Sequence, residues 1–183
     1  MTPRAGRLRR HSRLSGARPY RHRVTTHAGA VAPAHPPQWV LRVVNSFMRV
    51  VLPSPVHGLV GSRLLLLRFS GRRTGRRYAV PAARHVVEGQ ECVLTYAPWR
   101  LNLRGGVDVE VVWRGTARRA RADLVEDVPA VVAAYAAKFD EYGLRGSRLW
   151  LGVRTTVRRP PTADELAAAV RELGLSIVRL APR

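Results

Sequence analysis

The densest group of residues that could hold a ligand is Gly71-Arg72-Arg73-Thr74-Gly75-Arg76-Arg77. Its two glycines permit a tight turn with positive φ and leave backbone N–H groups accessible. Four guanidinium groups and one hydroxyl surround the same point, a combination that suits a phosphate or a chain of carboxylates. Spacing alone leaves a second interpretation equally open, a solvated basic hairpin loop or part of a nucleic-acid-binding patch.

A second segment of interest is Pro98-Trp99-Arg100-Leu101-Asn102-Leu103-Arg104-Gly105-Gly106. The proline and the glycine pair bracket about one helical turn, in which Trp99 and Leu103 share a face. Taken by itself, this segment is better explained by a tryptophan that fills the core and an asparagine that satisfies nearby backbone groups.

Other catalytic signatures are absent from the sequence. It contains no nucleophile elbow, no P-loop and no dinucleotide-binding glycine motif. His57, His85 and the single cysteine, Cys92, are isolated from one another, so no metal site is expected. The carboxylates are few and form no obvious acid–base pair. If the chain is an enzyme, a bound cofactor must carry the difficult chemistry.

The composition supports one domain and an anionic partner. The chain has 183 residues, 46% of them hydrophobic, and a formal net charge of +20. Residues 1–87 contain 17 arginines and no acidic residue, and 31 of the 32 basic residues are arginine. Such a surplus favours nucleic acid, anionic lipid or a phosphate-rich or carboxylate-rich ligand. A biased base composition of the genome explains the preference for arginine at least as well.

Hairpins are the elements that must position these segments. Short apolar or alternating runs predict strands at Leu64–Phe69, Tyr78–Val87 and Glu91–Tyr96, the last two forming a hairpin. Val107–Trp113 and Thr116–Val125 alternate and flank a turn, which predicts a second hairpin. The arginine-rich segment then connects the first two strands, and the tryptophan segment connects the hairpins.

Two helices and two further strands are expected after the second hairpin. Asp127 is a predicted N-cap of a helix that ends at Gly143, and a strand is expected over Leu149–Val157. A capping box at Thr162 opens the second helix, and Leu175–Leu180 forms the last strand. The order predicts a mainly β fold, an antiparallel sheet or barrel with added helices.

The N-terminal part is expected to differ from the rest. Residues 1–37 have no periodicity and predict a disordered basic tail or an overextended start, so that the domain comprises residues 38–183. Residues 38–52 predict an amphipathic helix that either packs on the domain or lies on an anionic membrane. No secretory or membrane-spanning segment is expected, which favours a cytoplasmic protein with a peripheral membrane contact left open.

Taken together, the motifs resemble a known family. The strand leading into G-R-R-T-G at 71–75, Pro81 in the next strand and P-W-x-x-N-L-R at 98–104 resemble the deazaflavin-dependent nitroreductase family over roughly residues 39–142. The resemblance implies an FMN-binding-type split β-barrel that uses the 5-deazaflavin coenzyme F-420. It also implies an oxidoreductase that transfers a hydride from the reduced cofactor to a quinone-like, nitroaromatic or other conjugated acceptor.

The resemblance assigns roles to individual residues. Its cofactor-binding positions are Gly71, Arg72, Arg73, Thr74, Gly75, Pro81, Trp99, Asn102, Leu103 and Arg104. Family substrate pockets draw aromatic residues from a late helix, which makes Tyr135 and Tyr142 the candidate proton donors. Split barrels of this type often form homodimers.

Two departures from the family pattern keep alternatives open. Tyr96-Ala97-Pro98 joins a strand directly to the tryptophan motif, and Gly105-Gly106 replaces a frequent Asn-Pro. Either change could reshape the pocket, so FMN is the alternative cofactor. The alternative function is non-catalytic: a protein that binds nucleic acid or anionic membrane, or one that stores the cofactor.

Overall fold

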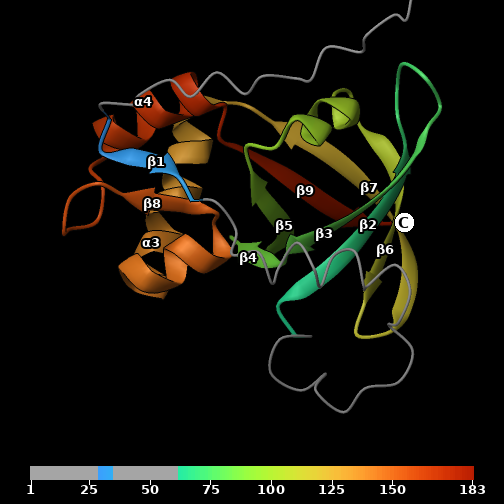
Figure 1. Ribbon diagram of the computed structural model, residues 1–183. Helices are drawn as coiled ribbons and strands as arrows, with labels where there is room; N and C mark the ends of the chain where they lie inside the picture. Colours follow the sequence, from blue (N-terminus) through green and yellow to red (C-terminus); the bar gives the residue numbers. More distant parts are fainter. Residues whose placement is uncertain (1–28, 35–61) are drawn as a thin grey trace, which may run out of the picture.

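The computed structural model describes residues 29–34 and 62–183, which form a curled antiparallel sheet with helices on one side (Figure 1). The strands are β1 (Val31–Pro33), β2 (Leu64–Ser70), β3 (Arg77–Ala83), β4 (His85–Val87), β5 (Gln90–Thr95), β6 (Val107–Trp113), β7 (Thr116–Val125), β8 (Val153–Thr155) and β9 (Ser176–Pro182). The helices are the 3-10 helix η1 (Pro98–Leu103), α3 (Val128–Trp150) and α4 (Ala163–Leu173).

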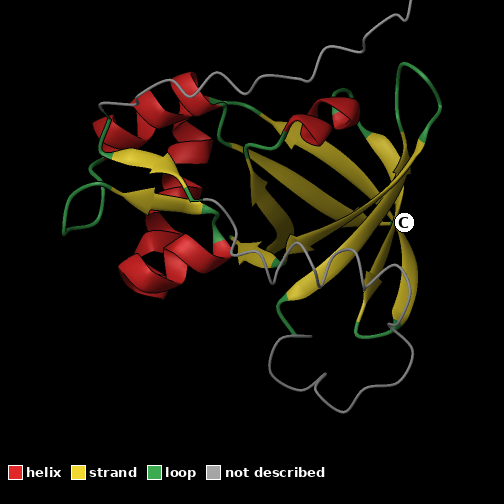
Figure 2. Ribbon diagram, viewed as in Figure 1, coloured by secondary structure: helices red, strands yellow, loops and turns green. Residues whose placement is uncertain are grey.

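Seven strands form the main sheet, in the order β3-β2-β6-β7-β9-β5-β4. Its two edge strands, β3 and β4, are consecutive in sequence and meet at Arg84, so the sheet curls back on itself (Figure 2). The strand expected over 78–87 is therefore divided by a corner. The predicted fold class, a mainly β antiparallel half-barrel with added helices, is confirmed. The expected N-terminal amphipathic helix, residues 38–52, lies outside the described residues.

The sheet separates two hydrophobic cores. Leu67, Val111 and Val178 belong to the core inside the barrel, whereas Tyr135 and Phe139 belong to the core between the sheet and the helices. Successive side chains of a strand point to opposite faces. β5 shows this directly, because Val93 packs inside the barrel while its neighbours Cys92 and Leu94 pack against the helices.

A shared carboxylate holds one end of the barrel together. Glu91 accepts a hydrogen bond from Arg84 Nε at 2.7 Å and another from Arg118 Nη2. The Arg84 guanidinium also lies 4.4 Å from the centre of the Trp113 ring. Glu91 stands near the start of β5 and η1 follows the end of that strand, so this cluster and η1 lie at opposite ends of the barrel.

The helix caps confirm two sequence predictions and the helix length corrects a third. Asp127 Oδ2 accepts from the Ala130 N–H at 3.1 Å, and Thr162 forms the expected capping box. Gly143 ends the first helical segment of α3 as predicted, because the chain leaves helical geometry there (φ 63°, ψ −178°), and a second helical segment then continues to Trp150. The strand expected from Leu149 is wrong at its start, because the buried residues Ser147 and Leu151 follow helical spacing.

The short strand β1 lies inside the range expected to be a disordered tail. Val31–Pro33 pairs with Val153–Thr155, and the Val31 side chain is buried against the helix-side core. This strand is stabilised by backbone hydrogen bonds to β8 and by apolar contacts of Val31, neither of which can be predicted from the local sequence. The rest of residues 1–37 lies outside the described part of the chain. Within that part, no helix is long and apolar enough to cross a membrane.

Candidate functional site

The arginine-rich segment forms the loop between β2 and β3. The Gly71 N–H donates to the Arg76 carbonyl at 2.7 Å, and the Gly75 N–H donates to the Gly71 carbonyl at 2.8 Å. Gly75 has φ +65°, a conformation that favours glycine. A Cβ added to Gly71 would lie 2.7 Å from Cε2 of Tyr78. Gly75 thus has the positive φ that the sequence predicts, whereas Gly71 does not and instead leaves room for the Tyr78 ring.

Asn102 joins this loop to η1. Its Oδ1 accepts a hydrogen bond from the Arg72 N–H at 3.1 Å, and its Nδ2 donates to the Trp99 carbonyl at 2.9 Å. One side chain thus connects the two segments that carry the family resemblance. The tryptophan segment taken alone suggests only that Asn102 binds backbone groups of its own turn. In the structure it also binds the backbone of the arginine-rich loop.

Three aromatic rings lie beside the loop. Phe69 and Tyr78 occupy paired positions of β2 and β3, and their rings stack at 5.3 Å between centroids. The Trp99 ring lies 6.0 Å from that of Phe69. Phe69 and Tyr78 are absent from the residues expected at the site, although they stand at the ends of the two predicted strands that the loop connects. Their contacts support the base of the loop from the barrel side.

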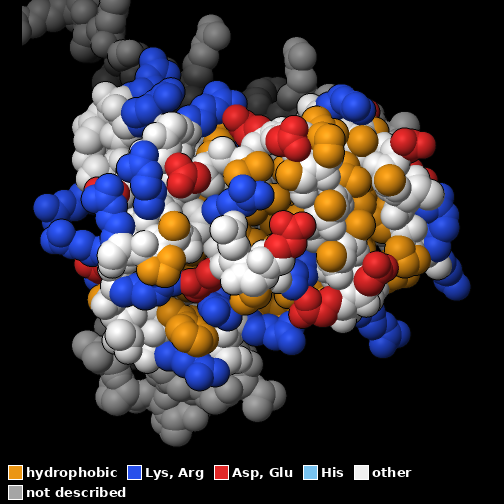
Figure 3. Space-filling view, turned by 180° about the vertical axis from the view of Figure 1, so that it is seen from behind, with side chains coloured by type: hydrophobic (Ala, Val, Ile, Leu, Met, Phe, Trp, Pro, Cys, Tyr) orange, Lys and Arg blue, Asp and Glu red, His pale blue; other side chains and the backbone are white. Residues whose placement is uncertain are grey.

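The loop carries positive charge that no carboxylate neutralises. Arg72, Arg73, Arg76 and Arg77 are exposed, and none of them forms an ion pair with any residue in the described ranges. Elsewhere on the surface, basic side chains are interspersed with acidic ones, as the view from behind shows (Figure 3). The loop is therefore a place where an anionic ligand would meet uncompensated guanidinium groups.

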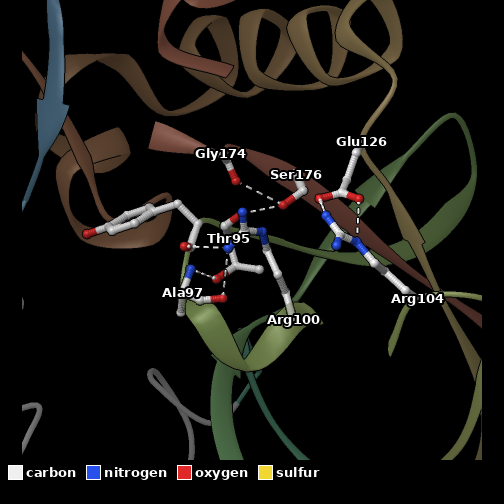
Figure 4. Close-up of polar contacts among 8 residues, drawn as sticks. Thr95, Ala97, Arg100, Arg104, Glu126, Gly174 and Ser176 are labelled. Atoms are coloured by element: carbon white, nitrogen blue, oxygen red, sulfur yellow. Dashed lines mark hydrogen bonds and ion pairs between the residues drawn. The ribbon is translucent and has the colours of Figure 1, made fainter. Parts of the chain in front are cut away.

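The other predicted cofactor-binding residues have different surroundings. Arg104 is engaged by Glu126 through two hydrogen bonds of 2.9 and 2.8 Å (Figure 4). These bonds hold the pKa of the Glu126 carboxyl below its ordinary value, so the charge of Arg104 is already matched. Leu103 is fully buried in the barrel core, and Pro81 lies on β3 opposite Leu66. Leu103 and Pro81 are thus parts of the barrel wall and core.

The two candidate tyrosines are not brought to the loop. Tyr135 is completely buried in the helix-side core, and burial raises the pKa of its hydroxyl. Tyr142 lies on the same helix and contacts His85, with 3.0 Å between Oη and Nδ1. His85 belongs to the corner between β3 and β4, whereas the loop lies at the far end of β2. No group of three or more potential metal ligands occurs within the described residues.

Arg100 positions η1 and is a residue that the sequence does not single out. Its Nη1 donates to the Tyr96 carbonyl at 2.9 Å and to the Ala97 carbonyl at 3.3 Å (Figure 4). Its guanidinium also approaches Gly174, the left-handed residue that ends α4. Burial lowers the pKa of this guanidinium. Arg100 thereby fixes the start of η1 against the end of α4.

We expect Asn102→Ala to release the loop without unfolding the barrel. Two hydrogen bonds are lost, each contributing about 0.5–1.5 kcal/mol, and the Arg72 N–H loses its acceptor. The measurement is amide hydrogen exchange at Arg72, which should become faster in the variant. Asn102→Asp is the matched control because it keeps an acceptor oxygen and should preserve much of the protection. Equal exchange rates in the wild type and Asn102→Ala would contradict this role.

Comparisons with known proteins give only distant similarities. No family model matches the sequence, and no curated protein matches it.

Solved structures with a similar chain path include HutZ, described as the heme storage protein from Vibrio cholerae, with 17% identity, TM-score 0.43, and coverage of 67% of this chain and 82% of that one. A conserved hypothetical protein from Mycobacterium tuberculosis has 17% identity, TM-score 0.41 and 82% coverage of both chains. An F420 reductase has 15% identity, TM-score 0.35, and coverage of 72% and 96%. Likeness at this level assigns no ligand and no activity to this chain.

Proposed function

We propose that this chain is a deazaflavin-dependent oxidoreductase that holds coenzyme F-420 at the loop between β2 and β3. The observation that carries the proposal is the hydrogen bond between the Arg72 N–H and Asn102 Oδ1. It joins the two segments whose sequences resemble the family, at a point surrounded by arginines that have no carboxylate partner among the described residues.

The charge of the loop fits this cofactor. Coenzyme F-420 carries a phosphate and a glutamate tail, so it is a polyanion. Arg72, Arg73, Arg76 and Arg77 have no carboxylate partner in the described chain, so binding would not first have to break an ion pair. Hydrogen bonds to charged groups contribute about 1.5–3 kcal/mol each before desolvation is subtracted. Arg104 is also among the predicted cofactor-binding residues, but it is paired with Glu126 and is not included among the residues that bind the anion in this proposal.

The residues around the loop have separate tasks in this proposal. The arginines bind the anionic part, and Asn102 holds the loop in place through the Arg72 N–H. The rings of Phe69, Tyr78 and Trp99 pack against one another on the barrel side of the loop and η1. When bound, the reduced cofactor supplies the hydride, and the protein supplies position and electrostatics. The acceptor class remains as expected from the resemblance: a quinone-like, nitroaromatic or other conjugated compound.

The experiment compares two double variants for cofactor binding and turnover. Arg72→Ala/Arg73→Ala should weaken binding of F-420 about tenfold to hundredfold, the equivalent of about 1.4–2.8 kcal/mol. Oxidation of the reduced cofactor by menadione should fall in parallel at subsaturating cofactor. Arg145→Ala/Arg148→Ala is the matched control, because it also removes two exposed positive charges but lies on α3. The control should bind and react like the wild type.

Three results would overturn this proposal or parts of it. Equal cofactor affinity in both double variants would remove the loop as the binding site. Cofactor binding without oxidation by any quinone or nitroaromatic acceptor would leave a storage protein and remove the oxidoreductase. A protein that binds neither F-420 nor FMN, yet binds nucleic acid with steep salt dependence, would favour the polyanion-binding alternative.

A further inference from the structure

A polar cleft lies at the opposite end of β2 from the arginine-rich loop. It has a volume of about 380 Å³ and is lined by residues of the turn before β2, the corner between β3 and β4, and α3. The lining residues that matter here are Arg63, Arg84, His85, Lys138, Glu141 and Tyr142. A volume of this size is within the range of small-molecule sites. None of these residues contributes to the proposed F-420 site, so the inference does not depend on it.

The cleft carries an excess of positive charge. Lys138 Nζ lies 2.5 Å from Glu141 Oε2, so this pair is matched. Arg84 Nε lies 2.7 Å from Glu91 Oε1, but Glu91 is shared with Arg118 and does not line the cleft. Arg63 has no carboxylate partner within the part of the chain that the structure describes. An anion in the cleft would therefore meet the Arg63 guanidinium first.

Arg63 is held in place before any ligand arrives. Its carbonyl accepts from the Arg84 N–H at 2.7 Å, which fixes the turn before β2 to the corner. Its guanidinium carbon lies 5.2 Å from the centre of the Tyr142 ring and 5.5 Å from that of the Trp150 ring. Such cation–π contacts orient a guanidinium while leaving its N–H groups free to donate. Less entropy is then lost when an anion binds.

His85 adds a neutral polar group to the same cleft. The ring is 2% exposed, and its Nδ1 lies 3.0 Å from Tyr142 Oη. When the tyrosine hydroxyl donates to Nδ1, the ring proton is on Nε2. Nε2 has almost no exposed surface, and the Trp150 carbonyl also acts on this ring. His85 therefore holds the Tyr142 hydroxyl in place at the wall of the cleft.

We propose that this cleft binds a small monocarboxylate through the Arg63 guanidinium, with its organic part against the Tyr142 ring and Val86. Carboxylate geometry matches the planar fork of arginine. Val86 lines the cleft and is 41% exposed, so it offers apolar surface to the body of such a ligand.

Benzoate titrated into the full-length ¹⁵N-labelled protein tests the proposal, with inorganic phosphate as a second arm. Benzoate should give saturable shifts at His85, Lys138 and Tyr142, with a dissociation constant of about 1 mM, as expected of a small ligand with few contacts. Arg63→Gln should weaken it at least tenfold. Arg145→Gln, an exposed arginine of α3 outside the cleft, should leave it unchanged.

Three outcomes would overturn the assignment. These are the absence of saturable shifts up to the solubility limit of benzoate, equal affinity in Arg63→Gln and the wild type, or shifts confined to residues 71–77. A fourth outcome, tighter binding of phosphate than of benzoate at the cleft, would contradict the assignment of a carboxylate as the ligand. Loss of F-420 binding in the Arg72→Ala/Arg73→Ala variant, with benzoate binding intact, would show that the two sites are independent.

Discussion

Replacing Glu91 with alanine is expected to destabilise the protein by about 3 kcal/mol, because removing one member of a buried ion pair leaves uncompensated charge. Glu91 is the shared partner of Arg84 and Arg118 at one end of the barrel. Its side chain is 14% exposed, so water cannot fully replace it. In the variant, two guanidinium groups would face each other beside Trp113 without a counter-charge.

The matched control for this prediction is Glu110→Ala. Glu110 also pairs with an arginine, Arg68, at 2.6 Å, but its side chain is 43% exposed. Exposed pairs typically contribute about 0–1 kcal/mol. The measurement is the free energy of unfolding in urea for both variants and the wild type. Equal losses in the two variants would show that the cluster around Glu91 does not stabilise the barrel.

The stability of the protein is expected to fall as the pH is lowered from 7 to 4, with His85 as a main cause. The pKa of His85 is lowered from 6.5 to about 4, first by burial and then by the positive charge of Lys138, with a smaller effect of Arg63. The Trp150 carbonyl and Glu141 act in the opposite direction. Between these pH values the unfolded chain binds a proton that the folded chain does not, so unfolding is favoured as the pH falls.

The size of the His85 contribution to the pH dependence of stability follows from the shift of its pKa. A difference of one pKa unit corresponds to about 1.4 kcal/mol, so the His85 contribution should reach about 2 kcal/mol at pH 5 and about 3 kcal/mol at pH 4. His85→Gln removes the titrating group, and its unfolding free energy should depend less steeply on pH. Carboxylates with lowered pKa values, such as Glu126, titrate in both proteins and cancel in the comparison. Identical slopes would contradict the burial of a neutral His85.

The second hairpin shows what local pattern can predict. β6 and β7 have the bounds expected from alternation, Val107–Trp113 and Thr116–Val125. Arg114 and Gly115 between them both have positive φ, as a tight hairpin turn requires. Here each local signal agrees with the final pairing. β1 is the opposite case, since its partner β8 is more than a hundred residues away and nothing near Val31 indicates it.

The sequence indicates the arginine-rich loop and the tryptophan segment, but it does not show that the two lie in contact. Neither segment identifies a site by itself, and the two are assigned to one through their joint resemblance to a known family. The hydrogen bond between Arg72 and Asn102 spans 30 residues, and only the fold brings the two together. Pairing of Arg104 with Glu126 and the distance of Tyr142 from the loop also depend on strand order. Only the folded structure therefore distinguishes Arg104, which is paired with Glu126, from the four loop arginines, which have no carboxylate partner in the described ranges.

The most direct test of the proposed function is a titration of the wild-type protein with F-420 and, separately, with FMN. Tryptophan quenching and the fluorescence polarisation of each cofactor report binding. We predict saturable binding of F-420 that is tighter than that of FMN, because the glutamate tail adds negative charge that the arginine-rich loop can match. Absence of F-420 binding, or tighter binding of FMN, would contradict the account of Arg72 and Arg73 as the residues that select this cofactor.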